Sequence, residues 1–119
     1  MEKFNFEELK VYQKSLILID RIYAETKLFP KEEVYGLTSQ FRRAAISIAL
    51  NIAESSGSSN PEFRRYLQIS FNSVKECVVC VEIAQRQNYL QIEEYNHYRK
   101  DLAELSKMIT SLMKYLTRK

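Results

Sequence analysis

The feature that most constrains this chain is the spacing of its apolar residues. From Gln91 onward, apolar side chains recur at alternating steps of three and four residues without a lapse, at Tyr95, Tyr98, Leu102, Leu105, Ile109, Leu112 and Leu116. This spacing places the apolar side chains along one side of an α-helix, and it is typical of helices that pack against other helices.

Three earlier stretches have the same helical spacing and are separated by breaks. The first covers residues 6–27, and its predicted core stripe consists of Leu9, Tyr12, Leu16, Ile19 and Tyr23. The second begins after Pro30, loosens near Gly36 and ends near Ser55. Its predicted core stripe consists of Val34, Leu37, Phe41, Ala45, Ile48 and Ile52. The third covers residues 61–87, with a predicted core stripe of Phe63, Leu67, Phe71, Val74, Val78 and Val81.

Few residues interrupt these stretches. The chain has only 2 Gly and 2 Pro, which argues against turn-rich β-sandwiches and barrels. The clearest turn is the serine-rich run at 55–59, and Asn88 is a plausible end of the third helix. Short connections favour antiparallel neighbours, so the sequence predicts an all-α, up-and-down antiparallel four-helix bundle. The 119 residues suit a single domain over 1–119 and are short for two.

Hydropathy and cysteine content indicate the cellular location of the protein, and its charge is only weakly biased. No apolar run approaches the roughly 18–20 residues of a membrane span, and the first residues lack the apolar region of a signal peptide. With 2 Cys in addition, we predict a cytoplasmic protein. Residues 1–59 carry 8 Lys/Arg and 8 Asp/Glu, whereas residues 60–119 carry 10 and 7. The positive excess therefore lies in the second half, a weak bias that solvated helix faces would also explain.

The second helix is apolar on more than one side. A projection at about 100° per residue places Ile46, Ala49, Leu50 and Ala53 beside its core stripe. We predict that this face forms an interface between subunits of a homo-oligomer, because the small alanines let another helix approach closely. The alternative is that another helix of the same chain covers it.

The remaining side of the second helix carries a polar stripe of Gln40, Arg43, Ser47, Asn51 and Glu54. One interpretation is a solvated surface. The other is that Asn51 and Glu54 are partly buried and hydrogen-bonded, in which case they fix the register of the helix or of a subunit contact.

Residues suited to catalysis or metal binding are few and isolated. Cys77 and Cys80 have the spacing of a redox or zinc motif, but they lie inside a predicted helix among valines, which favours core packing. His97 is the only histidine, and with Glu94 it forms one Glu-x-x-His pair where a di-iron bundle site needs two. We therefore predict no catalytic residue, no metal site and no cofactor, and a protein that is not an enzyme.

Arginine pairs beside aromatic residues are the remaining candidates for a functional site. Arginine binds phosphate bidentately and stacks on bases, and exposed aromatic rings add stacking surface. In an antiparallel hairpin Arg43 lies level with Lys75, so that the two could share one basic patch. The predicted nucleic-acid-binding residues are Arg42, Arg43, Arg64, Arg65 and Lys75. The alternative is that these charges are simply solvated.

Several of these residues fall in a pattern that resembles a known family. The runs FPKEE at 29–33, YGLTSQFRRAA at 35–45 and NIAE at 51–54 resemble the signature of the four-helix-bundle proteins encoded in intervening sequences of 23S ribosomal RNA genes. The chain is also similar to the accessory variability protein of diversity-generating retroelements. It departs from the family pattern at 57–59, where Gly-Ser-Ser stands in a loop that commonly holds an arginine.

The resemblance implies an assembly as well as a fold. It implies a homopentameric ring and, from the retroelement relatives, a basic surface for structured RNA and a reverse-transcriptase-like partner, carried over to Arg42 and Arg43. It implies a structural role for the motif positions Gln40, Ser47, Asn51 and Glu54.

The sequence thus favours a non-enzymatic, oligomeric bundle that associates with RNA through basic patches, each modest alone and multiplied around a ring. The alternative function is a protein–protein interaction or scaffold module without nucleic-acid affinity.

Overall fold

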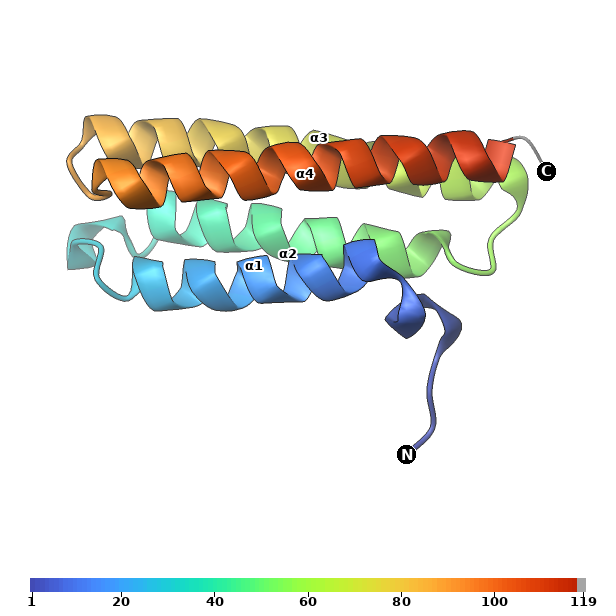
Figure 1. The fold of residues 1–119 in the computed structure, drawn as a ribbon. Coiled ribbons are helices and arrows are strands. Elements are labelled where there is room, and N and C mark those ends of the chain that lie inside the picture. The colour runs from blue at the N-terminus through green and yellow to red at the C-terminus, as the bar shows by residue number, and fades with distance from the viewer. Residues whose placement is uncertain (118–119) are drawn as a thin grey trace.

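Four long helices form the structure, a computed structural model that describes residues 1–117. They are α1 (Lys10–Thr26), α2 (Leu37–Ser55), α3 (Asn60–Arg86) and α4 (Ile92–Thr117), with short 3₁₀ helices at Asn5–Glu8 and Lys31–Glu33. The helices alternate in direction, α1 and α2 form one layer, and α3 and α4 form the other (Figure 1). The predicted all-α, up-and-down bundle is confirmed.

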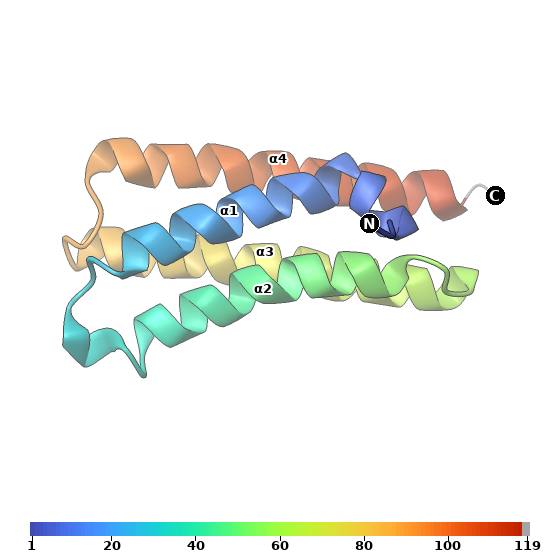
Figure 2. The ribbon, with the colours of Figure 1, turned by 90° about the horizontal axis from the view of Figure 1, so that it is seen from below.

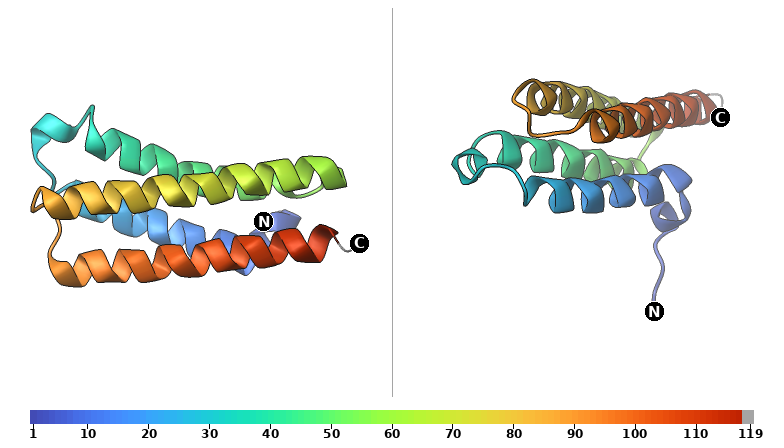
Figure 3. Two further views of the ribbon diagram at one scale, coloured as in Figure 1. Left: turned by 90° about the horizontal axis from the view of Figure 1, so that it is seen from above. Right: turned by 60° about the vertical axis from the view of Figure 1, so that its left-hand side comes forward.

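The two layers lie against each other along their length (Figures 2 and 3). Both termini and the serine-rich connection lie at one end of the bundle, and the two other connections lie at the opposite end (Figure 1). Within the described part of the chain, every helix is too short or too polar to cross a membrane.

The predicted core stripes of the second and fourth helices are largely confirmed. In α2, the residues Leu37, Phe41, Ala45, Ile48 and Ile52 are buried, and in α4 the buried residues are Tyr98, Leu102, Leu105 and Ile109. Val34 is exposed instead, because it lies before α2 in the connection from α1.

The predicted core face of the first helix is wrong in part. Leu9, Tyr12 and Ile19 are partly buried against the core, but Leu16 and Tyr23 are exposed. The fully buried side chains of α1 are those of Val11, Ser15, Leu18, Ile22 and Thr26. The two hydroxyls are buried at little cost, because each donates a hydrogen bond of 2.6 Å to a carbonyl of its own helix. A pattern of large apolar residues does not include the buried Ser15 and Thr26, so it predicted a core face turned toward the neighbouring side of α1.

The break near Gly36 has a definite cause. A Cβ at this position would lie 2.8 Å from Oε1 of Glu33, so only glycine leaves room for that carboxylate. The same oxygen accepts a hydrogen bond of 3.0 Å from the N–H of Leu37, the first residue of α2. Glu33 thereby satisfies an N–H group that a helix N-terminus leaves unpaired, and α2 begins here rather than at Pro30.

Charged side chains close the contact between α1 and α4. Lys14 lies 2.9 Å from Glu104, and Arg21 lies 3.2 Å from Asp101. The hydroxyl of Tyr98 donates a hydrogen bond of 3.2 Å to the carbonyl of Arg21. These contacts fix the rotation of α4 about its own axis.

Asn88 ends α3, as the sequence predicts. It has φ 64°, in the left-handed region. Around it, the N–H of Tyr89 donates to the carbonyl of Ala84 at 2.8 Å and the N–H of Asn88 donates to that of Gln85 at 3.0 Å. This pair of bonds is a Schellman motif, in which the residue after the helix must adopt a positive φ.

We expect Asn88→Ala to lower the free energy of unfolding by about 1 kcal/mol, because a Cβ without a compensating polar side chain is strained in the left-handed region. Asn88→Gly should leave the stability unchanged or raise it. Urea denaturation of both variants measures the difference. Equal losses for alanine and glycine would contradict the account of this helix end.

Candidate nucleic-acid interface

The polar stripe of α2 divides into a buried and an exposed part. Asn51 is half-buried, and its Nδ2 donates to the carbonyl and the Oγ of Ser47 at 2.9 and 3.1 Å. Ser73 of α3 donates to the same Oγ at 2.8 Å. Glu54 is exposed. Ser47 therefore joins α2 to α3 and Asn51 holds Ser47 within α2, while Glu54 is part of the solvated surface.

Arg42 is held within the contact between α1 and α2. Its Nε donates a hydrogen bond of 2.8 Å to Oγ1 of Thr26, and its Nη2 donates one of 3.5 Å to the carbonyl of Tyr23. The guanidinium carbon lies 4.4 Å from the centre of the Tyr23 ring. Arg42 thus has a structural role, and it does not extend freely from the bundle surface as the sequence analysis expected.

Arg43 and Lys75 do not meet in one hollow. Arg43 is exposed and lines a cavity of about 250 Å³ between α2 and α3. Glu76 lines this cavity together with Gln40. Lys75 extends over Phe71, with its Nζ 5.5 Å from the ring centre. The residue of α3 that shares the cavity with Arg43 is therefore a glutamate and not the expected lysine.

The other predicted residues belong to α3. Arg64, Arg65 and Lys75 are exposed, and the guanidinium carbon of Arg65 lies 5.1 Å from the ring centre of Tyr66. The structure therefore divides the five predicted cations between the two layers, with Arg42 and Arg43 on α2 and the remainder on α3.

Three lysines of α4 extend this charge and were missed. Lys100, Lys107 and Lys114 are exposed and recur every seven residues, so they lie along one side of the helix. None of the three forms an ion pair with another described residue. The spacing was visible in the sequence, but the direction in which this side faces was not.

Three of the acidic residues of α4 pair with α1. Asp101 contacts Lys14 and Arg21 at 3.8 and 3.2 Å, Glu94 lies 3.5 Å from Arg21, and Glu104 lies 2.9 Å from Lys14. The hydrogen bond and the charge of Lys14 hold the pKa of Glu104 below its usual value, with smaller contributions from Lys100 and Lys107 of α4 itself. On the side of the lysines, α4 also carries the exposed Glu93, one heptad before Lys100, so this side is cationic from Lys100 onward.

The two cysteines are core residues, as expected. Both are buried as free thiols. Burial raises the pKa of Cys77 far above the usual range and that of Cys80 to about 11. At neutral pH both therefore remain protonated, a form that is poorly nucleophilic and binds metals weakly.

His97 is exposed and lies 3.4 Å from Asp101. Residues 1–117 contain no group of three or more side chains placed to hold a metal ion.

The apolar face of α2 is covered only in part. Ala49 is 6% exposed and is enclosed by the protomer itself, so it offers almost no surface to a second subunit. Ile46 and Ala53 are half-buried, and Leu50 is 60% exposed. Ile46, Leu50 and Ala53 therefore have surface left to contact a second subunit, as the predicted interface requires.

Comparisons with known proteins agree with the fold. The family model of the 23S rRNA-intervening sequence protein matches residues 7–111. Five chains of solved structures also match. One is a protein of unknown function from the S23 ribosomal protein family of Bacteroides thetaiotaomicron, 27% identical, with a TM-score of 0.79 over 87% of this chain and 95% of that one. No curated protein matches the sequence.

We expect Arg42→Gln to lower the free energy of unfolding by about 1–3 kcal/mol, because it removes a charged hydrogen bond to a buried hydroxyl and the stacking on Tyr23. Arg43→Gln is the matched control and should change the stability by less than about 0.5 kcal/mol. Equal effects in chemical denaturation would show that Arg42 is a solvated charge.

Proposed function

Because the chain belongs to the 23S rRNA-intervening sequence protein family, we propose that it is a non-enzymatic, self-associating bundle that contacts structured RNA. The proposed contact is the cationic face, defined as Arg64, Arg65 and Lys75 of α3 with Lys100, Lys107 and Lys114 of α4. This face replaces the patch of Arg43 and Lys75 expected from the sequence, and it leaves Arg42 to the bundle.

The arrangement of charges on α4 carries this proposal. Its carboxylates at Glu94, Asp101 and Glu104 pair with Lys14 and Arg21 of α1. Its three lysines are exposed and form no ion pair with a described residue, although the charges of Lys100 and Lys107 act on Glu104 of the same helix. Phosphate groups of RNA would pair with these ammonium groups, and each contact releases a condensed counterion.

Self-association would multiply this modest charge. The exposed Leu50 shares the outer side of α2 with Ile46 and Ala53. Arg42 of α2 stacks on Tyr23 of α1, so these two residues lie at the same level of the bundle. Because the two helices are antiparallel, Leu16, which is two turns before Tyr23, lies level with the part of α2 two turns after Arg42, near position 49. An apolar face over both helices is typical of a protein interface.

A homopentameric ring, which the family resemblance implies, would repeat the cationic face five times. A linked set of weak sites binds one long RNA far more tightly than a single site does.

A second candidate function is a protein-interaction module without RNA affinity. It is favoured by Val79 and Ile83 of α3, which are exposed and one helical turn apart. A reverse-transcriptase-like protein is one partner that the retroelement resemblance suggests. In that case charge substitutions on α4 would leave the binding of the partner unchanged.

We expect the protein to bind a structured RNA with a 5′-hydroxyl end at about 50 mM salt and to lose affinity steeply as salt rises. Log K should fall linearly as log [salt] rises, and in the variant Lys100→Gln/Lys107→Gln/Lys114→Gln the slope of this fall should be smaller in magnitude by about 2. Filter binding over a salt series measures both quantities.

The matched control removes three lysines from the other layer, as Lys3→Gln/Lys27→Gln/Lys31→Gln. Its slope should change by less than 1, within the effect of about one phosphate contact. The proposal fails if the protein does not bind RNA at low salt, or if the two triple variants lose affinity equally.

We expect light scattering at micromolar concentration to give a mass several times 14.1 kDa. Leu50→Asp should yield the monomer, because an unpaired carboxylate in an apolar interface is costly to bury. Leu28→Asp, at an exposed site in the connection after α1, should leave the oligomer intact. A monomeric wild-type protein would contradict the assembly.

A further inference from the structure

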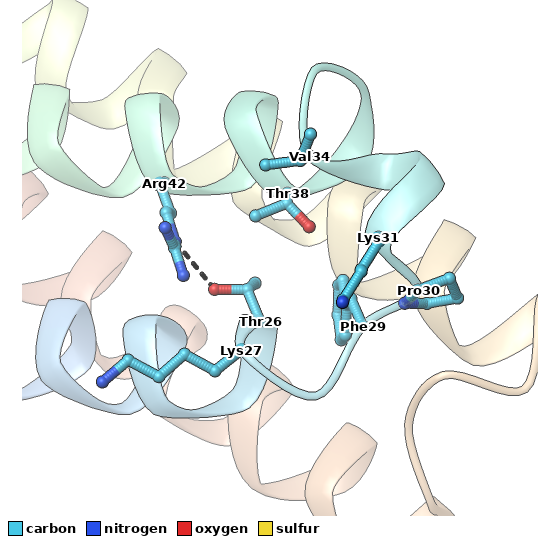
Figure 4. Close-up of a pocket in the computed structure, with 8 residues that line it drawn as sticks. All are labelled: Thr26, Lys27, Phe29, Pro30, Lys31, Val34, Thr38 and Arg42. Atoms are coloured by element: carbon cyan, nitrogen blue, oxygen red, sulfur yellow. Dashed lines mark hydrogen bonds between the residues drawn. The ribbon is translucent and has the colours of Figure 1, made fainter.

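A pocket outside the cationic face lies where α1 ends and α2 begins (Figure 4). It has a volume of about 340 Å³, at the lower end of the range for small-molecule sites. Three of its lining residues are the cations Lys27, Lys31 and Arg42, and none of its lining residues is acidic. We call it the α1–α2 pocket.

Arg42 supplies this pocket with a fixed positive charge. Its two hydrogen bonds, to Thr26 and to the carbonyl of Tyr23, use two of the five N–H donors of a guanidinium. It forms no ion pair with any residue that the structure describes. A half-buried, immobilised cation with unused donors is favourable for binding an anion, since its position requires no further ordering.

Thr38 provides a second, independent indication. The residue is only 5% exposed and lines the pocket, and its oxygen points into the space between Thr26 and Lys31 (Figure 4). Its hydroxyl has no hydrogen-bond partner among residues 1–117, and it is not sealed from solvent. A buried polar group normally has a partner, so this hydroxyl is available to a ligand.

The lysines complete the charge of the pocket. Lys31 extends toward Phe29, and the ammonium of Lys27 lies at the rim, away from the centre (Figure 4). The nearby Glu33 does not line the pocket, and its oxygens are held elsewhere: Oε1 accepts the N–H of Leu37 and Oε2 accepts the hydroxyl of Tyr89 at 2.9 Å. The net charge of the lining is therefore positive.

The rest of the lining is apolar. Phe29 packs against Tyr89 with 5.3 Å between the ring centres, and it lines the pocket together with Pro30 and Val34. An aromatic ring, a proline and a branched aliphatic side chain form a surface suited to a flat organic group. The ligand should combine a compact anion with such a group.

We propose that the α1–α2 pocket binds a nucleoside 5′-monophosphate group. The phosphate would contact Arg42, Lys31 and the hydroxyl of Thr38, and the base would lie against Pro30 and Val34. The same chemistry occurs in a free nucleotide and at the 5′-phosphorylated end of an RNA strand. Only the second source rests on the proposed RNA-binding function.

The experiment measures binding of uridine 5′-monophosphate to the full chain by calorimetry and by amide chemical shifts. Uridine and inorganic phosphate are the comparison ligands. We expect the nucleotide to bind at least about tenfold more tightly than either, because each contributes only one half of the contacts. The shifts should be confined to residues 26–42.

Two variants test the assignment. Thr38→Val keeps the shape of the side chain and should weaken nucleotide binding about tenfold, the effect of one lost hydrogen bond to a charged group. Lys31→Gln should have a similar effect. Lys10→Gln, at an exposed lysine of α1, is the control and should bind as the wild type does. Unchanged thermal unfolding of each variant shows that the fold is intact.

The two sources are separated with oligouridylates that carry a 5′-phosphate or a 5′-hydroxyl. Tighter binding of the 5′-phosphorylated oligomer than of both the 5′-hydroxyl oligomer and the mononucleotide identifies a strand end. Equal binding of the two oligomers identifies the free nucleotide. The variant Lys100→Gln/Lys107→Gln/Lys114→Gln should retain full affinity for the mononucleotide, so a failure of RNA binding by the cationic face is recognised separately.

Three results would overturn the proposal. One is the absence of nucleotide binding at millimolar concentration. Another is uridine or inorganic phosphate binding as tightly as the nucleotide. The third is unchanged affinity in Thr38→Val and Lys31→Gln.

Discussion

The charged contact between α1 and α4 is the interaction on which the surface of this bundle depends. Lys14 and Arg21 draw the carboxylates of α4 inward. This pairing adds modest stability where it is exposed to solvent. The contact agrees with the rotation that the buried apolar stripe of α4 requires, in which Lys107 and its neighbours one heptad away face outward.

The α1–α2 layer differs in character from the α3–α4 layer. Its outer surface carries exposed apolar residues such as Leu50, and the pocket around Arg42 lies at the end where α1 connects to α2. The connection that forms this end is held by Glu33, which caps α2 and accepts a hydrogen bond from Tyr89. One carboxylate therefore orders the connection. We propose that self-association and small-anion binding belong to one layer and RNA contact to the other.

The sequence predicted the helices and most of the core, because an uninterrupted apolar stripe such as that of α4 has one way to be buried. It failed for α1, where Ser15 and Thr26 are buried through hydrogen bonds to their own helix and periodicity alone favoured the wrong side. The role of Arg42 and the pocket depend on how two helices meet across a connection, which local patterns do not encode. The orientation of Lys100, Lys107 and Lys114 likewise required the contact partners of α4.

Lysine acetylation in the presence and absence of a 5′-hydroxyl RNA, read by mass spectrometry, tests the central claim most directly. The account predicts that bound RNA protects Lys75, Lys100, Lys107 and Lys114, while Lys3, Lys27 and Lys31 react at an unchanged rate. Protection of the lysines of the α1–α2 layer instead, or of no lysine at all, would contradict the assignment of the RNA contact to the cationic face.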